Sequence, residues 1–313
     1  MSSAHERRQD VWNDESSMEI ERLESPAKRT EPINVALIDG SITWSIGLQE
    51  RAEKAFTLPT PAGESPPFYI VRHRGVPFYY VHFHGVDFVS ASGNVQVGFT
   101  RTWSALRVLG VRDVFSGAAA GSLHRDYRVG DIVVIDDFLD FSTHRPRSIL
   151  MEIWERPPYI GAAFKEPTCP ELRAILLQVA MSQYRDGRVH ERGVLAQVEG
   201  HRFETPAEIR ALKLLGGDFV AHHQASEAIY ARELGMHYTA LNFISNIGEG
   251  LEPGTAWASG EFARAHYALC TEILLDAVAL AAQRTNTCTE CPQPDTNPGN
   301  IRPEDVKLKP VWR

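Results

Sequence analysis

The chain has 313 residues, 43% of them hydrophobic, and a formal net charge of −8 at pH 7. A chain of this length and apolar content buries one large core or at most two. The net negative charge and the lack of a basic stripe argue against nucleic acid as a partner. No apolar run approaches the ~20 residues of a membrane-spanning helix.

The two ends of the chain differ in composition from its middle. Residues 1–32 are charged, low in apolar content and without an apolar signal core, so we expect a disordered extension of a cytoplasmic protein. Residues 33–285 form one predicted domain, and residues 286–313 a Pro-rich tail that is either loose or docked on it. Cys288 and Cys291 make a lone CxxC in this tail. With no second pair and only four cysteines in the chain, we favour a polar tail over zinc or redox chemistry and expect no metal.

Short apolar runs bounded by turns predict the first elements of the domain. In chain order these are a strand at 34–38, a hairpin of strands at 68–74 and 77–84 around Gly75 and Val76, the end of a helix at 103–109 stopped by Gly110, and strands at 114–116 and 131–135. The first strand runs into the turn Asp39-Gly40-Ser41, and the strand at 114–116 runs into the small-residue segment 117–121.

The second half alternates helices with strands. In chain order these are a helix at 171–184, a strand at 194–198, a helix opened by Thr205, Pro206 and Glu208, a strand at 219–221, a helix at 226–234, a strand at 238–243 and a closing helix at 261–282. This alternation predicts an α/β fold, a single layered domain with a mixed central β-sheet flanked by helices.

In such sheets ligands bind at the loops past the strand ends. The predicted site is therefore formed by the turns at Ser41, His84, Ala118, Glu199 and His222.

Four segments resemble, in order and spacing, those of the trimeric purine nucleoside phosphorylase and methylthioadenosine phosphorylase family. They are residues 121–136 (GSLHRDYRVGDIVVID), 143–148 (THRPRS), 199–210 (EGHRFETPAEIR) and 215–218 (LGGD). The third is close to the family's Glu-Gly-Pro-Arg-Phe-Glu-Thr-Pro-Ala-Glu signature, and the resemblance covers roughly residues 33–285.

This resemblance implies a phosphorylase-like fold, a homotrimer and a pentosyltransferase activity. Inorganic phosphate, the co-substrate, attacks the anomeric carbon of a purine nucleoside or its 5′-methylthio analogue, giving the free base and a (methylthio)ribose 1-phosphate. No further cofactor is expected. The transition state resembles an oxocarbenium ion, and the base leaves with negative charge, so the protein must donate hydrogen bonds to the base and hold the phosphate.

The base-binding residues implied by the resemblance are Glu204, Asn246 and Phe203. Glu204 stands where the family accepts a proton from the purine ring edge, and the Asn246 amide donates to the ring nitrogen and a 6-oxo group, which favours 6-oxopurines. Phe203 is expected to face the base. The alternatives are a helix-capping carboxylate for Glu204 and a loop asparagine for Asn246.

The phosphate-binding residues implied by the resemblance are Ser41, His82, His84, Ala118 and His223, with Ala119 and His222 on the substrate. The family's Arg-Phe-His becomes His82-Phe83-His84, its Thr or Asn becomes Ala118, and its Met-Ser or Met-Thr pair becomes His222-His223. A histidine offers neither the permanent charge nor the bidentate geometry of arginine.

The four histidines leave three interpretations open. They form an anion site of charged imidazoles, a metal site, or a set of hydrogen-bonded side chains in a wet cleft. Correspondingly, the alternatives to phosphorolysis are a nucleoside binder without turnover and a nucleoside hydrolase assisted by histidine or metal.

Overall fold

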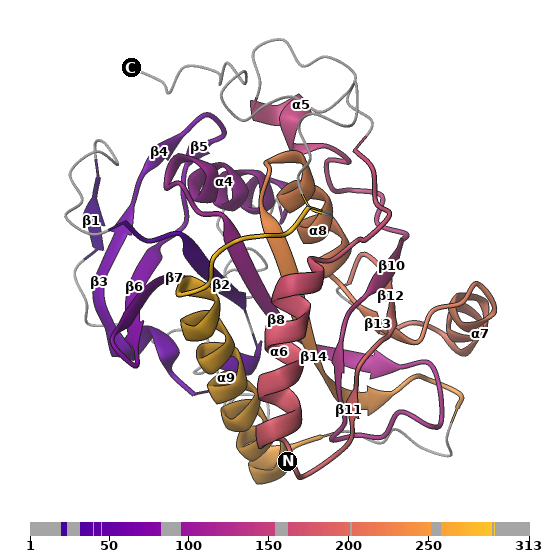
Figure 1. Ribbon diagram of the computed structural model, residues 1–313. Helices are drawn as coiled ribbons and strands as arrows, with labels where there is room; N and C mark the ends of the chain where they lie inside the picture. The colour runs from indigo at the N-terminus through magenta and orange to yellow at the C-terminus, as the bar shows by residue number, and fades with distance from the viewer. Residues whose placement is uncertain are drawn as a thin grey trace, which may run out of the picture.

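The fold comes from a computed structural model (Figure 1), which describes residues 20–23, 32–39, 41–44, 46–82, 95–153, 162–200, 202–251, 258–289 and 291. The strands are β1 (Ile20–Arg22), β2 (Val35–Asp39), β3 (Ala52–Thr57), β4 (Pro59–Thr60), β5 (Gly63–Glu64), β6 (Phe68–His73), β7 (Val76–His82), β8 (Asp113–Ser122), β9 (Ile132–Val134), β10 (Asp137–Asp140), β11 (Val189–His190), β12 (Val194–Gln197), β13 (Phe219–Ala221) and β14 (His237–Ile247). The helices are α2 (Ser41–Trp44), the 3₁₀ helix η3 (Leu48–Arg51), α4 (Val95–Val108), α5 (Ile149–Ile153), α6 (Pro170–Gln183), α7 (Pro206–Leu214), α8 (Gln224–Glu233) and α9 (Gly260–Ala282).

A mixed sheet forms the centre of the molecule. Its main path runs β1-β3-β6-β7-β2-β8-β13-β12-β10, and β14 joins β8 to β9, which in turn pairs with β11. β2 is parallel to β7 and β8, whereas β6 is antiparallel to β7 and β13 to β8. The predicted fold class, an α/β domain with a mixed central sheet and flanking helices, is confirmed.

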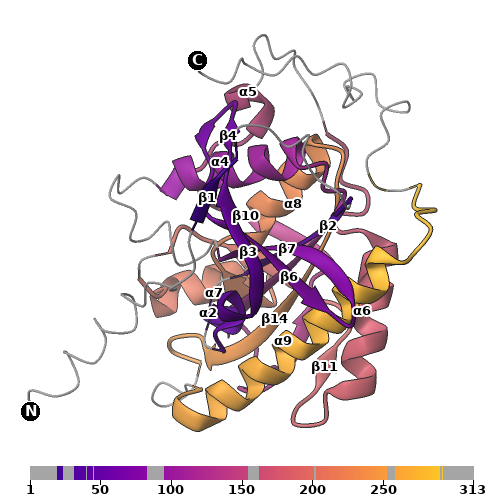
Figure 2. The same cartoon turned by 90° about the vertical axis from the view of Figure 1, so that its left-hand side faces the viewer.

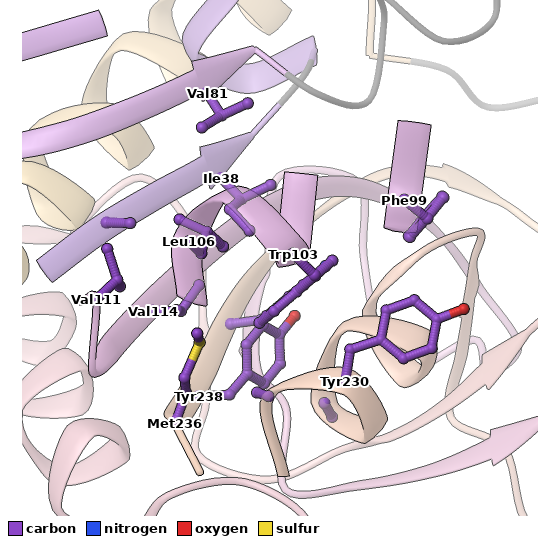
Figure 3. Packing of buried hydrophobic residues seen from close by; sticks show 14 of the residues in the cluster. Ile38, Val81, Phe99, Trp103, Leu106, Val111, Val114, Tyr230, Met236 and Tyr238 are labelled. Carbon is purple, nitrogen blue, oxygen red and sulfur yellow. The ribbon is translucent and has the colours of Figure 1, made fainter. Parts of the chain in front are cut away.

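Alternate residues of the central strands point to opposite layers. Ala36 and Ile38 of β2 belong to the core cluster that α4 and α8 cover, where Trp103 lies among aliphatic and aromatic side chains (Figure 3). Val35 and Leu37 belong to the cluster beneath α6 and α9, which run side by side in both views (Figures 1 and 2). This double burial explains why the β2 sequence is a continuous apolar run.

The sequence predicts no membrane-spanning helix, but α9 is long and apolar enough to cross a membrane by length and composition alone. However, 61% of its most apolar stretch is buried inside the domain, against α6 and the sheet. Its apolar character is therefore that of a core helix.

Local sequence signals predicted most elements correctly. The hairpin of β6 and β7 is confirmed, with its turn at Arg74 and Gly75, whose φ angles are 49° and 81°. The turn lies one residue earlier than expected, because both central residues of such a tight hairpin need positive φ. Thr205 caps α7 as predicted, accepting from the Glu208 N–H while the Glu208 side chain accepts from the Thr205 N–H.

Three expectations were wrong. Residues 117–121 are not a turn but the second half of β8, because β14 pairs with them along the whole strand. Ile20–Arg22 form β1, paired with β3, inside the segment expected to be disordered. The strand at 238–243 continues to Ile247, so Asn246 lies on β14 and not in a loop.

Candidate functional site

One edge of β8 changes partner near the centre of the sheet. On this edge β2 pairs as far as Asp39 with Gly117, and β13 takes over, antiparallel, at Gly121. β14 follows the other edge along the whole strand. Within the described part of the chain, residues 118–120 therefore have no strand partner on the first edge. Ligands bind at such switch points of α/β sheets, so the edge of β8 at residues 118–120 faces the candidate site.

The predicted histidines gather around this gap. His82 ends β7 opposite Asp39 and is buried. His222 and His223 follow β13, and because β13 is antiparallel to β8, they run back along it toward Ala119. Ser41 opens α2 just past the end of β2, but its side chain, like the whole of His84, lies outside the described residues.

Asn246 lies beside the end of β8, where a bulge in β14 sets it opposite Gly121. A Cβ on Gly121 would come 3.1 Å from the Asn246 Nδ2, so any larger residue at this position would press against the amide. The Ser245 hydroxyl lies 3.0 Å from the Asn246 Oδ1 and 3.2 Å from the Ala120 carbonyl oxygen, and its single proton is donated to one or the other. The Asn246 amide brings two N–H donors to this end of β14.

Glu204 is buried directly before α7, at 7% exposure. The capping box of α7 is made by Thr205 and Glu208, so Glu204 is not the capping carboxylate. Burial raises the pKa of Glu204, and the nearby Glu208 charge adds to this, while a backbone hydrogen bond and Arg202 oppose it. A buried acceptor with no structural role in the helix cap suits a ligand N–H.

The start of α7 is held against the segment that follows Asn246. A Cβ on Gly248 would meet the Ile209 side chain at 3.0 Å, and one on Gly250 would meet Pro206 at 2.8 Å. Beneath them α7 packs on a small core cluster made of Leu123, Ala196, Ile209, Leu212 and Val220. These contacts bring the Glu204 loop and the end of β14 to the same side of the sheet.

Phe203 does not share the burial of its neighbour Glu204. Its side chain is 52% exposed on the single chain. The expectation that it faces a base stays untested, because the described residues of one chain do not enclose it.

A buried cation, Arg145, is the residue that sequence reasoning missed. It belongs to the segment 143–148, which the resemblance covers without assigning a role to any of its residues. Glu199 fixes this loop: its Oε2 accepts from the backbone N–H of Thr143 at 2.7 Å and of His144 at 3.2 Å. Burial tends to raise the pKa of Glu199, but these hydrogen bonds outweigh it and lower the pKa below its usual value. Two of the resembling segments thus serve to position Arg145.

The Arg145 guanidinium lies beside the two histidines that follow β13. Its Nη1 donates to the His222 carbonyl. Its Cζ lies 4.6 Å from the centre of the Phe99 ring, and that ring stacks on His223 at 6.0 Å. Arg145 is only 5% exposed, and its Nε and Nη2 have no hydrogen-bond partner among the described residues.

Burial lowers the pKa of Arg145 against the opposing charges of Glu199 and Glu227, yet a guanidinium stays charged near neutral pH. A buried permanent cation with unused donors is a site for an anion.

The metal interpretation of the histidines finds no support in the described residues. His82, His222 and His223 do not form a group of three or more ligand atoms close enough for one ion. His84 lies outside this comparison.

Comparison with known proteins adds the following. The phosphorylase superfamily model matches residues 46–279. A 6-oxopurine nucleoside phosphorylase of Pyrococcus furiosus is 39% identical over 150 residues, which are 47% of this chain and 56% of that protein. A probable S-methyl-5′-thioinosine phosphorylase of Methanothermobacter thermautotrophicus is 34% identical over 221 residues, 70% of this chain and 73% of that protein. The first of these alignments thus spans little more than half of the relative's length.

Among solved structures, a methylthioadenosine phosphorylase from Schistosoma mansoni in complex with tubercidin superposes with a TM-score of 0.69. The match covers 81% of this chain and 93% of that one at 22% sequence identity, so it concerns the fold alone.

Proposed function

The chain belongs to the phosphorylase superfamily, and we propose that it cleaves purine nucleosides with a 6-oxo base by phosphorolysis. The observation that carries this is the pair of Asn246, whose buried amide brings N–H donors to the end of β14, and the buried acceptor Glu204. A 6-oxopurine offers the complementary pattern, with acceptors at the ring nitrogen N7 and the 6-oxo group and a donor at N1–H.

The reaction is a substitution at the anomeric carbon. A phosphate oxygen bonds to C1′ as the C1′–N9 bond breaks, and the bonding electrons leave with the purine. Asn246 donates hydrogen bonds to the negative charge that develops on the base, and Glu204 holds the base by accepting from N1–H. The products are the free purine and a pentose 1-phosphate.

Phosphate binding is assigned to the gap beside β8. There the edge of residues 118–120 without a strand partner offers backbone N–H from alternate residues, and His82 and His223 follow the neighbouring strands. Arg145 supplies the permanent charge that the histidines lack, since its Nε and Nη2 have no partner among the described residues. In this proposal Arg145 takes over the electrostatic role of the arginine that the resemblance leads one to expect at His82.

The names of the relatives support the choice of base. One similar protein is a 6-oxopurine nucleoside phosphorylase and another a probable S-methyl-5′-thioinosine phosphorylase, both named for 6-oxo substrates. Others are named S-methyl-5′-thioadenosine phosphorylase, after a nucleoside with a 6-amino base. The names of the relatives differ in the group at the 5′ position of the sugar, so both 5′-hydroxyl and 5′-methylthio nucleosides should be tested.

The test is base release from inosine, adenosine and their 5′-methylthio analogues, with and without phosphate. Phosphate-dependent release of hypoxanthine with a pentose 1-phosphate is the expected result. Release of free sugar without phosphate would indicate a hydrolase, and binding without release a nucleoside-binding protein. Either result would overturn the proposal.

We further propose a homotrimer in the cytoplasm, acting in purine salvage without a cofactor in catalysis. A trimer would place a second copy near the exposed Phe203. Light scattering at micromolar concentration checks the assembly, and a monomer there would contradict it.

A further inference from the structure

Four potential metal ligands meet at the opposite end of β14 from Asn246. They are Cys169, His237, Cys288 and Cys291, and their ligand atoms all lie within 4.8 Å of one another. Cys169 is the N-cap of α6, His237 is the first residue of β14, and the other two follow α9. Three separate parts of the chain therefore converge on one point.

The distances between these atoms match those around a tetrahedral ion. The Cys169 Sγ lies 3.8 Å from the Cys288 Sγ and 3.5 Å from the His237 Nδ1. With Zn–S bonds of about 2.3 Å and Zn–N bonds of about 2.0–2.1 Å, a tetrahedron has S–S edges of about 3.8 Å and S–N edges of about 3.5 Å. Cys288 and Cys291 have the two-residue spacing with which one loop gives two thiolates to zinc.

The four side chains form a mostly buried ligand set. None of the four cysteines of the chain forms a disulfide, and Cys169, Cys291 and His237 are buried. Three thiols and an imidazole that meet around one point are the donor set of a structural zinc site of the Cys₃His type.

A shell of polar contacts holds the ligand loop in place. Asn286 lies 2.7 Å from the His237 Nε2, so the ring turns its Nδ1 to the cluster. The Asn286 Oδ1 accepts from the backbone N–H of Cys288 at 3.1 Å, which ties the position of this cysteine to that of the His237 ring. Arg284 bonds to Asp113 at 2.8 Å and also to Glu171, which accepts from Thr287 as well. The loop after α9 is thus fixed to the start of β8 and of α6.

We propose that Cys169, His237, Cys288 and Cys291 bind a structural zinc ion that fastens the segment after α9 to the body of the domain. Four protein ligands close the coordination sphere, which leaves no position for a substrate. His237 and Asn246 are nine residues apart along one strand, a distance of about 30 Å, so the ion takes no part in the chemistry at the other end.

The direct test is the metal content of the full chain purified without added metal and without an affinity tag that binds metal. About one zinc per chain is expected by plasma mass spectrometry. The double variant Cys288→Ser/Cys291→Ser should contain about one tenth of the wild-type zinc or less. Cys270→Ala is the matched control, because Cys270 is the fourth cysteine, buried in α9 and outside the cluster, and this variant should keep its zinc.

Cobalt gives a second measurement that does not depend on how well the serine variants fold. Wild-type chain stripped of metal and loaded with Co²⁺ should show the intense visible bands of a tetrahedral site and thiolate-to-metal charge transfer. A chelator should lower the Tm of the wild type by about 5–10 °C and leave the double variant unchanged. Wild-type protein with no bound metal, with stoichiometric iron, or with a mass 2 Da low from a disulfide would overturn the proposal.

Discussion

The two ends of β14 present opposite kinds of polar site. At the Asn246 end, Asn246, Glu204 and Arg145 are buried, and the Nε and Nη2 of Arg145 have no hydrogen-bond partner among the described residues. We propose that a ligand binds to these groups and leaves again. At the His237 end the polar side chains close on one another and on the loop after α9. In the two proposals made above, one strand therefore serves an open site for turnover and a closed site that holds the fold.

Removing the donor at the open end should have the largest effect. Asn246→Ala is expected to lower kcat/KM for inosine by about 10²–10³, the cost of one hydrogen-bond donor to charge that develops in the transition state. Asn286→Ala, at the closed end, is the control and should leave kcat unchanged. Equal losses in both variants would show that the two ends are not functionally separate.

Replacing the buried cation tests how the open end holds phosphate. Arg145→Lys should raise the KM for phosphate by about 10–100-fold, because lysine cannot reproduce the fork of donors, and should change the KM for the nucleoside little. Arg147→Lys in the same loop is exposed and serves as the control. If the KM for phosphate is the same in wild type and Arg145→Lys, the charge comes from the histidines instead.

The pH profile reports on Glu204. Its pKa is raised by burial, and only the carboxylate form accepts from the base, so base binding should weaken as the pH falls through that raised value. The loss should begin above the pH near 4.3 at which an exposed glutamate titrates. The measurement is the inhibition constant for hypoxanthine as a function of pH. Glu204→Gln should bind hypoxanthine more weakly at neutral pH, and its binding should change less than that of the wild type on the acid side of the profile (the acid limb).

Glu208→Gln removes the same charge four residues away and is the control for Glu204. Glu208 belongs to the helix cap, so this substitution should lower the stability of α7. It should keep an acid limb, moved to lower pH because the Glu208 charge no longer raises the pKa of Glu204. An acid limb unchanged in Glu204→Gln would remove Glu204 from the base site.

The smallest effect on activity is expected away from both ends, at Glu233, where only stability should change. Burial raises its pKa to about 7, above the ordinary value near 4.5. The folded state therefore holds this proton more tightly than the unfolded state, and its contribution to stability is lost as the pH rises from about 4.5 to 7.

Glu233→Gln mimics the protonated form and should stabilise the protein at pH 8 by roughly 2–3 kcal/mol, with no gain at pH 4. Urea unfolding at both pH values measures this. The base-binding profile should not change, which separates the pH dependence of stability from that of the open site. A stability gain of equal size at both pH values would assign it to something other than ionisation.

Much of the fold could be predicted because its signals are local. The capping residues Thr205 and Glu208, the apolar runs of β2 and β13 and the turn after β6 each lie within a few neighbouring residues. The resembling segments likewise identify Glu204 and Asn246 as candidate base-binding residues from the sequence alone. The extent of β8 through residues 117–121 was missed, because pairing with β14 overrides the turn tendency of a glycine-rich run.

The sequence by itself therefore determined the α/β fold class and the order of most of its elements, and it provided the candidate residues for the base. Only the tertiary structure decided what depends on distance in space. Arg145 became a buried cation because Glu199, from another segment, fixes its loop. The lone CxxC acquired partners because Cys169 and Cys288, 119 residues apart, meet where α6 and β14 begin. No local pattern encodes such a meeting, since it arises from how the sheet and helices pack together.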